Sequence, residues 1–245
     1  MLQTKIRYIT VEQMREVDRL MIEEYKIELQ QMMENAGRNL ARLAVRKFLH
    51  DLQTYREVIV LAGPGGNGGG AMVAARHLFN WGFPVSVYLS HQHEKYSGVP
   101  GYQMKILKNM GLHIGESDEQ ISSTSAALII DGIIGYSLVE TPRHGAANRI
   151  IWANSSNIPI LSLDVPSGID STTGEIFDPA IQAMVTMTLA LPKTGFQKPG
   201  IQKYTGELFV ADISVPFGVY KRLGIFREEL PDFSKDEIVK LPPLT

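Results

Sequence analysis

The chain has 245 residues, of which 44% are hydrophobic, so residues 1–245 can form a single α/β domain with a sizeable core. Its 24 basic and 26 acidic residues give a formal charge of −2. The charge therefore gives no reason to expect nucleic acid or an anionic membrane as its main partner. The absence of cysteine excludes disulfides, thiolate nucleophiles and cysteine–zinc sites.

Two kinds of segment that direct a protein to or across a membrane are not recognisable in the sequence. No apolar run approaches the roughly 18 residues of a membrane-spanning helix. Residues 1–7 lack the apolar core of a signal peptide. We therefore expect a soluble protein located in the cytoplasm.

Two helices are predicted before the first strand. Thr10 is suited to cap a helix that runs to about residue 25, and a second helix is predicted over about residues 30–49. Their apolar positions include several methionines, which we interpret as packing residues. Two leading helices are unusual for an α/β protein, whose sheet tends to start the chain.

From residue 57 onward, short apolar runs alternate with helical segments, which is the pattern of a parallel sheet covered on both faces. The pattern predicts strands over residues 57–62, 84–90, 112–115, 126–131 and 159–164, and helices over residues 70–81, 98–110 and 144–154. Residues 183–189 and 208–210 are expected to form further strands. The tail from Pro231, rich in proline and charge, is expected to cross the surface.

The stretch Gly63–Ala71, here called the glycine segment, joins the first strand to the following helix. Six of its nine residues are glycine. Glycine permits positive φ and an exposed backbone, so we expect N–H groups here to face a small polar or anionic ligand. A flexible linker is less consistent with the apolar, periodic segments on both sides.

Two more loops end strands at the same predicted edge of the sheet. They begin at Asp131 and Asp164. If the strand at 57–62 lies between those at 84–90 and 126–131, the two aspartates converge with Asn67 and Ser167. Oxygen ligands of these types suit a hard cation, and a carboxylate in a dry pocket can transfer protons. Either aspartate alone could instead only cap the turn that follows it.

Other motifs fit less well. Gly63 to Gly68 matches the Gly-x-Gly-x-x-Gly dinucleotide fingerprint, but Ser90-His91-Gln92-His93 stands where an acidic residue is expected. An ATPase phosphate loop would need Gly-Lys-Ser/Thr, which is missing. The two histidines with Glu94 could bind a metal, although no third ligand is evident and a solvated loop fits better. Ser167 lacks the Gly-x-Ser-x-Gly elbow of hydrolases.

From about Thr10 to Pro216 the chain resembles the NAD(P)HX epimerase family, which includes the N-terminal domain of bifunctional NAD(P)HX repair enzymes. The two leading helices are also usual in this family. The matching motifs are Met32-Met33-Glu34-Asn35-Ala36-Gly37, the glycine segment with residues 73–78, Asp131-Gly132-Ile133-Ile134-Gly135, residues 164–170 with Thr173-Gly174, Ala183, Thr186 and Thr188, Lys193-Thr194-Gly195, and Asp212-Ile213-Ser214-Val215-Pro216.

The resemblance implies a Rossmann-like three-layer αβα domain with a mostly parallel sheet, and a homodimer. It also implies interconversion of the R and S forms of hydrated NADH and NADPH, with one potassium ion per subunit. The fused dehydratase domain of the bifunctional members is not found here, so we expect a separate ATP- or ADP-dependent dehydratase as the pathway partner.

By the same resemblance, Asn67, Asp131 and Ser167 are expected to bind potassium. Asp164 is expected to transfer a proton at the hydrated nicotinamide carbon. Substrate contacts are expected from Gly65, Gly66, Asn67, Gly68, Gly69, Gly70, Gly135, Tyr136, Ser137, Leu138 and Asp164.

The chain departs from the family pattern at a few positions. Gly70 stands where the family has an aspartate, and Glu140 lies in a loop where a basic residue is usual, with Arg143 nearest. These departures keep a second hypothesis open, in which a catalytically diverged member serves as a dimeric ligand-binding or scaffold domain.

Overall fold

The computed structural model describes residues 6–50, 56–122 and 125–243. Within them, eight strands form one sheet in the order β3-β2-β1-β4-β5-β6-β7-β8. All neighbouring strands are parallel except β7 and β8. The strands are β1 (Val58–Ala62), β2 (Val85–Leu89), β3 (His113–Gly115), β4 (Leu128–Gly132), β5 (Ile160–Leu163), β6 (Val185–Leu189), β7 (Glu207–Ala211) and β8 (Ile238–Lys240).

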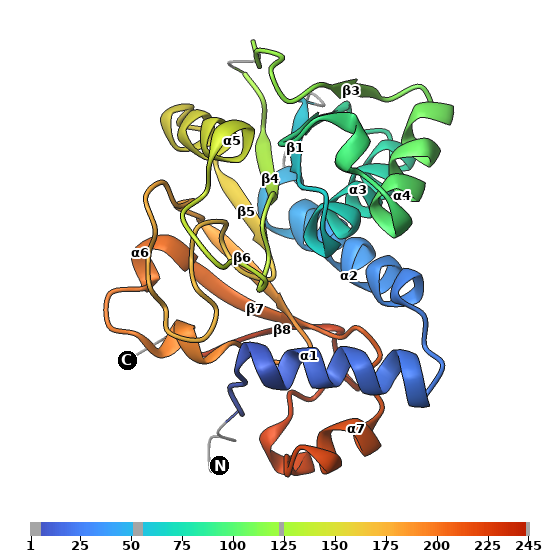
Figure 1. The fold of residues 1–245 in the computed structure, drawn as a ribbon, viewed down its shortest axis with the longest axis vertical. Helices are drawn as coiled ribbons and strands as arrows, with labels where there is room; N and C mark the ends of the chain where they lie inside the picture. Colours follow the sequence, from blue (N-terminus) through green and yellow to red (C-terminus); the bar gives the residue numbers. More distant parts are fainter. Residues whose placement is uncertain (1–5, 51–55, 123–124, 244–245) are drawn as a thin grey trace.

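Helices cover both faces of the sheet, and α1 (Val11–Arg19) and α7 (Phe217–Arg222) lie at its lower end in the view of Figure 1. The other helices are α2 (Leu29–Ala44), α3 (Gly66–Asn80), α4 (Gly98–Asn109), α5 (His144–Ser155) and α6 (Gln202–Thr205). Helices α1 and α2 each continue into a π-helical turn, at Leu20–Glu24 and Val45–Leu49. Short 3-10 turns occupy His93–Lys95, Thr194–Gln197 and Arg227–Glu229.

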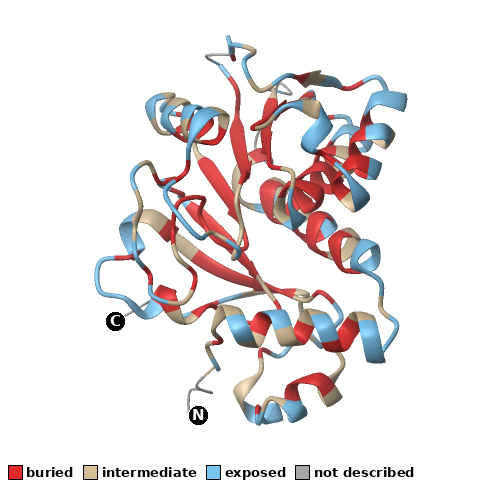
Figure 2. Cartoon of the chain, in the orientation of Figure 1, coloured by how far each residue is buried: buried red, intermediate tan, exposed pale blue. Residues whose placement is uncertain are grey.

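Strand β1 shows why this part of the chain forms a buried parallel strand. Val58 and Val60 pack with α2, α3 and α4 on one face, whereas Ile59 and Leu61 pack with α5 on the other. Every residue of β1 is buried, and Figure 2 shows the same for the central strands around it. A strand covered on both faces reads as a continuous apolar run. The predicted three-layer α/β fold is confirmed.

The N-terminal helix is held by the cap predicted at Thr10. Its hydroxyl accepts a hydrogen bond from the backbone of Gln13, whose side chain accepts from the backbone of Thr10. This capping box satisfies two backbone donors that the helix start leaves open. Helix α1 then packs against α7 through a separate apolar cluster that includes Val17 and Tyr220.

Three predictions about elements are wrong in detail. Helix α3 begins at Gly66 and not at residue 70. The tail expected to cross the surface contains β8, which pairs antiparallel with β7 and buries Ile238. Helices α6 and α7 were not predicted. The missed elements are short, at three residues for β8, four for α6 and six for α7, so their own sequence carries little periodic signal.

The order of the strands places one crevice at the carboxyl edge of the sheet. Strand β1 lies between β2 and β4, as predicted, and the chain reverses its direction of travel across the sheet at β1. Ligands of open α/β sheets bind at such a point. None of the helices in the described residues is long and apolar enough to cross a membrane.

Candidate functional site

The glycine segment is the start of a helix. Gly65 is the N-cap of α3, with φ −95° and ψ −168°. The chain is helical from Gly66 onward. None of the glycines of this segment has positive φ, so the freedom that glycine allows there is not used for a left-handed turn. The N-terminal end of α3 instead presents its free N–H groups and its positive dipole end at the carboxyl edge of β1.

Close packing explains why glycine is needed in this helix start. A Cβ atom on Gly68 would overlap the backbone carbonyl of Gly63. One on Gly69 would lie 2.7 Å from Sδ of Met33, and one on Gly70 would lie 2.8 Å from Cδ2 of Leu163. The missing side chains therefore let α3 approach the strand end and α2 closely.

Asp131 at the end of β4 is a buried carboxylate with four donors. Its Oδ1 accepts from Ser167 Oγ at 2.6 Å and from Ile133 N at 3.2 Å. Its Oδ2 accepts from Ser162 Oγ at 2.8 Å and from Ser167 N at 2.9 Å. Burial raises the pKa of Asp131, and these hydrogen bonds lower it in part. All four donors are neutral, so none supplies the positive charge that a buried carboxylate calls for.

Asn67 lies in the first turn of α3. Its Nδ2 donates to the carbonyl oxygen of Leu163 at 2.6 Å, which ties α3 to the end of β5. A Cβ atom on Gly135 would overlap Oδ1 of Asn67, so the glycine leaves room for this amide. Ser167 bonds to Asp131 and Ile134, and Asn67 lies against Gly135 of the same loop, so the three loops meet at this edge of the sheet.

This donor set suits a hard monovalent cation better than a transition metal. It offers carboxylate, amide and hydroxyl oxygens. The Ser167 hydroxyl donates to Asp131 and accepts from Ile134 N at 2.9 Å, which leaves it one further lone pair. Among the described residues, no group of three or more histidine or acidic side chains could hold a metal. These residues therefore fit a cation such as potassium.

Asp164, directly after β5, is fixed through one of its two carboxylate oxygens. Its Oδ1 accepts from Lys193 Nζ at 2.5 Å, from Thr188 Oγ1 at 3.1 Å and from Leu189 N at 3.1 Å. Its backbone φ is 62°, a strained value for aspartate. In the part of the chain that the structure describes, no donor reaches Oδ2. This second oxygen is therefore available to a ligand.

Lys193 is buried completely beneath Asp164. Apart from its ion pair with Asp164, its Nζ donates to Thr188 Oγ1 at 3.1 Å and to the carbonyl oxygens of Leu189 and Leu191 at 3.0 and 3.1 Å. A buried ammonium group with this many acceptors is fully satisfied. It fixes Asp164 in place and stabilises the negative charge of that carboxylate.

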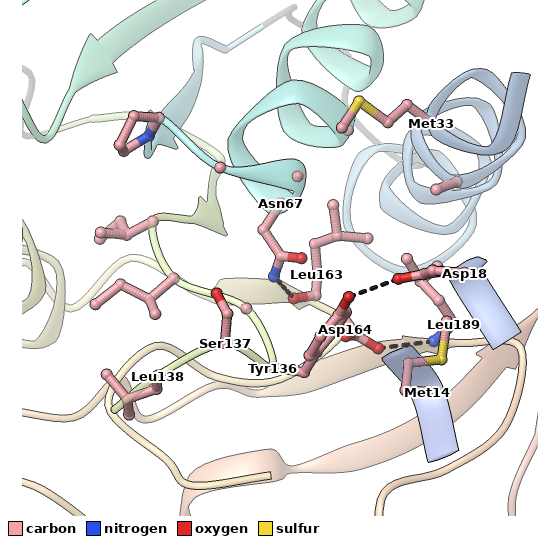
Figure 3. Close-up of a pocket in the computed structure, with 18 of the residues that line it drawn as sticks. Met14, Asp18, Met33, Asn67, Tyr136, Ser137, Leu138, Leu163, Asp164 and Leu189 are labelled. Carbon is pink, nitrogen blue, oxygen red and sulfur yellow. Dashed lines mark hydrogen bonds between the residues drawn. The ribbon is translucent and has the colours of Figure 1, made fainter. Parts of the chain in front are cut away.

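A cavity of about 460 Å³ opens above Asp164, within the usual size range of ligand pockets. Figure 3 shows Asn67 from α3, Asp164 from the end of β5 and Asp18 from α1 around the same space. The predicted site residues that line this cavity are Gly65, Gly66, Asn67, Gly70, Gly135, Tyr136, Ser137, Leu138 and Asp164.

The other predicted site residues lie behind the cavity wall. Gly68 and Gly69 do not line it, and both are buried where α3 packs against its neighbours. Asp131 and Ser167 lie beneath it, each 1% exposed. The cavity and the cation ligands are thus two layers of one site, with Asn67 belonging to both.

Asp18 is a cavity residue that sequence reasoning missed. It lies four residues after Met14 on α1, and both side chains line the cavity. Tyr136 donates its hydroxyl to Asp18 Oδ2 at 2.5 Å. Burial raises the pKa of Asp18, and the bond from Tyr136 lowers it in part. Burial also raises the pKa of Tyr136, and the charge of Asp18 raises it further.

A signal for Asp18 was present in the sequence but was weak. The residue borders the apolar face of a helix, which is also where ordinary solvated residues lie. The sequence gives Lys193 no role, because a lysine in a turn gives no sign that it is buried. His91 was dismissed with its loop, yet it lines the cavity, and its Nδ1 lies 2.9 Å from Ser90 Oγ. His93 points elsewhere, toward Lys108.

The charged groups on the cavity wall are mostly acidic. Asp18, Asp164 and Glu140 line it, whereas no lysine or arginine of the described residues does. Glu140 is largely exposed and pairs with Arg143 at 2.7 Å. Burial and the nearby charges of Lys95 and His144 lower the pKa of His91. Phosphate groups of a ligand would therefore depend on the N–H groups of α3.

Comparisons with known proteins identify the family of the chain. A family model described as "YjeF-related protein N-terminus" matches residues 29–195. An NAD(P)H-hydrate epimerase of Dehalogenimonas lykanthroporepellens is 42% identical over 219 residues, which cover 89% of this chain and 86% of the relative. A second, from Rhodopirellula baltica, is 31% identical, and the match covers 89% of this chain and 88% of the relative.

Longer relatives and a solved structure complete the comparison. The "Bifunctional NAD(P)H-hydrate repair enzyme Nnr" of Moorella thermoacetica is 35% identical over 85% of this chain, and the match covers 40% of that protein. The crystal structure of yeast ynu0, YNL200c, has a TM-score of 0.82 at 27% identity and covers 96% of this chain and 100% of that one. With more than half of its residues matched by the family model, the chain belongs to the YjeF-related N-terminus family.

Proposed function

We propose that this chain is an isomerase that interconverts the R and S epimers of hydrated NADH and NADPH. The printed names of two relatives that match over most of their length describe this activity. One observation in the structure carries the proposal. Asp164 is held by three donors at Oδ1, and its Oδ2 is left to a cavity that also contains the start of α3.

The reaction inverts a ring carbon that carries a hydroxyl group and is bonded to the ring nitrogen. The hydroxyl takes up a proton and leaves as water while the nitrogen lone pair forms a double bond to the carbon. A water molecule then adds to the opposite face and gives up a proton, and the nitrogen regains its lone pair. Atoms and charge balance, and the chemistry needs only one proton donor and one proton acceptor.

Asp164 is suited to be the proton acceptor. Its Oδ2 can take the proton of the adding water, and Lys193 stabilises the carboxylate that must be ionised to do so. The three donors on Oδ1 prevent the side chain from turning away from the ring. We therefore assign proton transfer to Asp164 and a positioning role to Lys193.

The cofactor's phosphates are proposed to lie at the start of α3. Gly65 and Gly66 are exposed there and line the cavity. Backbone N–H groups at a helix start bind phosphate without a basic side chain. Because the cavity wall has neither lysine nor arginine in the described residues, this helix end is the main electrostatic attraction for the phosphates.

We also propose one potassium ion per subunit, held by Asn67, Asp131 and Ser167. The fit is supported by the buried, uncompensated carboxylate of Asp131. When bound, the ion would neutralise that charge and fix the first turn of α3 relative to the ends of β4 and β5. A homodimer and a separate ATP- or ADP-dependent dehydratase are further parts of the proposal, to be checked by sedimentation and by the assay below.

The decisive assay supplies the R epimer of hydrated NADH together with a dehydratase that accepts only the S epimer. We expect the wild-type protein to accelerate the loss of the R epimer. Asp164→Asn should lower this acceleration by about 10²-fold or more, since it removes the proton acceptor. Glu16→Gln changes a residue of α1 that pairs with Arg19 outside the cavity and should retain activity. If the wild-type protein gives no acceleration at any concentration, the diverged, non-catalytic alternative is correct instead.

A further inference from the structure

The reaction above needs a second group, which must deliver a proton to the departing hydroxyl. Departure and addition occur on opposite faces of one flat ring. A single fixed carboxylate cannot reach both faces at once. The inference that follows rests on the proposed function, because it assigns this second group.

Besides Asp164, Asp18 is the acidic side chain of the cavity wall that is not largely exposed. It enters from α1, whereas Asp164 enters from the end of β5, and both line the cavity (Figure 3). The two elements are more than a hundred residues apart in the chain and approach the cavity from different sides. We propose that Asp18 is the second catalytic acid–base residue and that Tyr136 is the residue that positions it.

The hydrogen bond from Tyr136 supports this assignment. The tyrosine hydroxyl donates to Asp18 Oδ2 at 2.5 Å, so the aspartate is fixed through one oxygen, and no donor of the described residues reaches the other. Asp164 is arranged in the same way by Lys193. Each carboxyl group therefore has one oxygen held by the protein and one left for the substrate.

The environments of the two carboxyl groups differ in the sense that an acid–base pair requires. Asp164 has the buried ammonium group of Lys193 beside it, with Nζ 2.5 Å from Oδ1. Asp18 has the neutral hydroxyl of Tyr136 as its hydrogen-bond donor, and burial raises its pKa, with a smaller contribution from the charge of Asp164. Two carboxyl groups held in different surroundings are typical of an acid and a base that act together.

The two groups exchange roles with each inversion. Asp18 gives its proton to the departing hydroxyl on one face, and Asp164 takes a proton from the water that adds on the other. After one inversion Asp18 is ionised and Asp164 is protonated, which is the starting state for the reverse reaction. Exchange of protons with solvent restores the first state. No oxidant, reductant or further reactant is needed.

The test compares Asp18→Asn with Glu16→Gln, an exposed residue of the same helix that pairs with Arg19 away from the cavity. We expect Asp18→Asn to lower kcat by about 10²-fold or more while KM changes by less than about threefold. Glu16→Gln should keep wild-type kcat. Tyr136→Phe should lower kcat less than Asp18→Asn, because the carboxyl group remains but is no longer held.

A pH profile separates a catalytic role from a structural one. The titratable or charged groups that face Asp18 are Tyr136 from the loop after β4, and Asp164 and Lys193 from beyond β5 and β6. An acid must be protonated, so wild-type kcat/KM should fall as the pH rises through the pKa of Asp18. Asp18→Asn should lose this alkaline limb, and Asp18→Glu should restore it.

Labelled water gives an independent readout. If the hydroxyl leaves from one face and water adds to the other, each inversion in H2¹⁸O should place one solvent oxygen on the inverted carbon. The inference is overturned if Asp18→Asn has wild-type kcat while Asp164→Asn is inactive, or if inversion proceeds without label. A wild-type protein that is inactive contradicts the proposed function itself, so the two failures are distinguishable.

Discussion

At the scale of single residues, the pair of Asp164 and Lys193 is the main electrostatic feature of the site. The two side chains are 3% and 1% exposed, and their Oδ1 and Nζ atoms lie 2.5 Å apart. Burial of both charges is costly, and the attraction between them offsets that cost only while both are present. Loss of one partner should therefore lower the free energy of unfolding much more than loss of both.

This asymmetry gives a prediction about stability. Lys193→Met should lower the free energy of unfolding by about 3–5 kcal/mol, because Asp164 is left buried without a positive partner. The double variant Lys193→Met with Asp164→Asn should recover most of that loss and remain inactive. Urea unfolding of the wild type, of the single variants Lys193→Met and Asp164→Asn, and of the double variant measures the coupling. If the two single effects simply add, the pair is not coupled as described.

Asp18 gives a prediction about pH. Its pKa is raised in the folded protein, so its stabilising contribution is complete below the unfolded pKa of about 4 and is lost as the pH rises through the folded pKa. The amide of Asp18→Asn does not titrate. This variant should therefore melt a few degrees above the wild type at about pH 7.5, and the difference should shrink toward about pH 4. An equal difference at both pH values would contradict the assignment.

At the scale of elements, the start of α3 combines two demands on one short segment. Its exposed residues, Gly65 and Gly66, offer backbone N–H groups to the cavity. Its buried residues, such as Gly68, lie against backbone where no side chain fits. The six glycines among the nine residues of the glycine segment therefore serve packing as well as binding.

Two alanine substitutions in this helix start should have opposite effects on stability. Gly68→Ala should lower the free energy of unfolding by about 1–3 kcal/mol or more, because its Cβ would overlap the carbonyl of Gly63. Gly66→Ala should raise it by up to about 1 kcal/mol, because its Cβ would meet only Met33 Cε at an ordinary 3.6 Å. Thermal melts of the two variants check the signs. A stabilised Gly68→Ala protein would show that the helix start is not packed as described.

At the scale of the whole molecule, the site joins segments from most of the chain. Helix α1, the start of α3 and the loops after β4 and β5 all line one cavity, and Asn67 links it to the layer of oxygens below. An ion in that lower layer would bind only the folded protein. It should therefore stabilise the fold as a whole.

The proposed potassium site can be tested without measuring activity. Potassium chloride should raise the Tm more than choline chloride of equal concentration, by an amount that grows with ion concentration as expected for binding to the folded state. Asn67→Ala should lose the difference, whereas Ser137→Ala should keep it. Equal Tm values in the two salts for the wild type would contradict the site.

The sequence by itself determined the parts of this protein that local pattern controls. Apolar runs predicted the buried strands, Thr10 predicted the helix cap, and the strand ends predicted that Asp131, Asp164 and Asn67 converge. These follow from periodicity and from the shared edge of a parallel sheet. The start of α3 was placed four residues late, because glycine is usually excluded from helices and here it is required by a contact that only the folded chain contains.

Only the tertiary structure decided which side chains complete the site. Asp18 and Lys193 have no local signature, since one lies on an amphipathic helix and the other in a turn. They reach Tyr136 and Asp164 only when α1 and the segment after β6 pack against the carboxyl edge of the sheet. The physical reason is that burial and charge pairing are properties of the assembled chain. The glycine segment marks the site in the sequence, and the packing of distant elements supplies its acid–base groups.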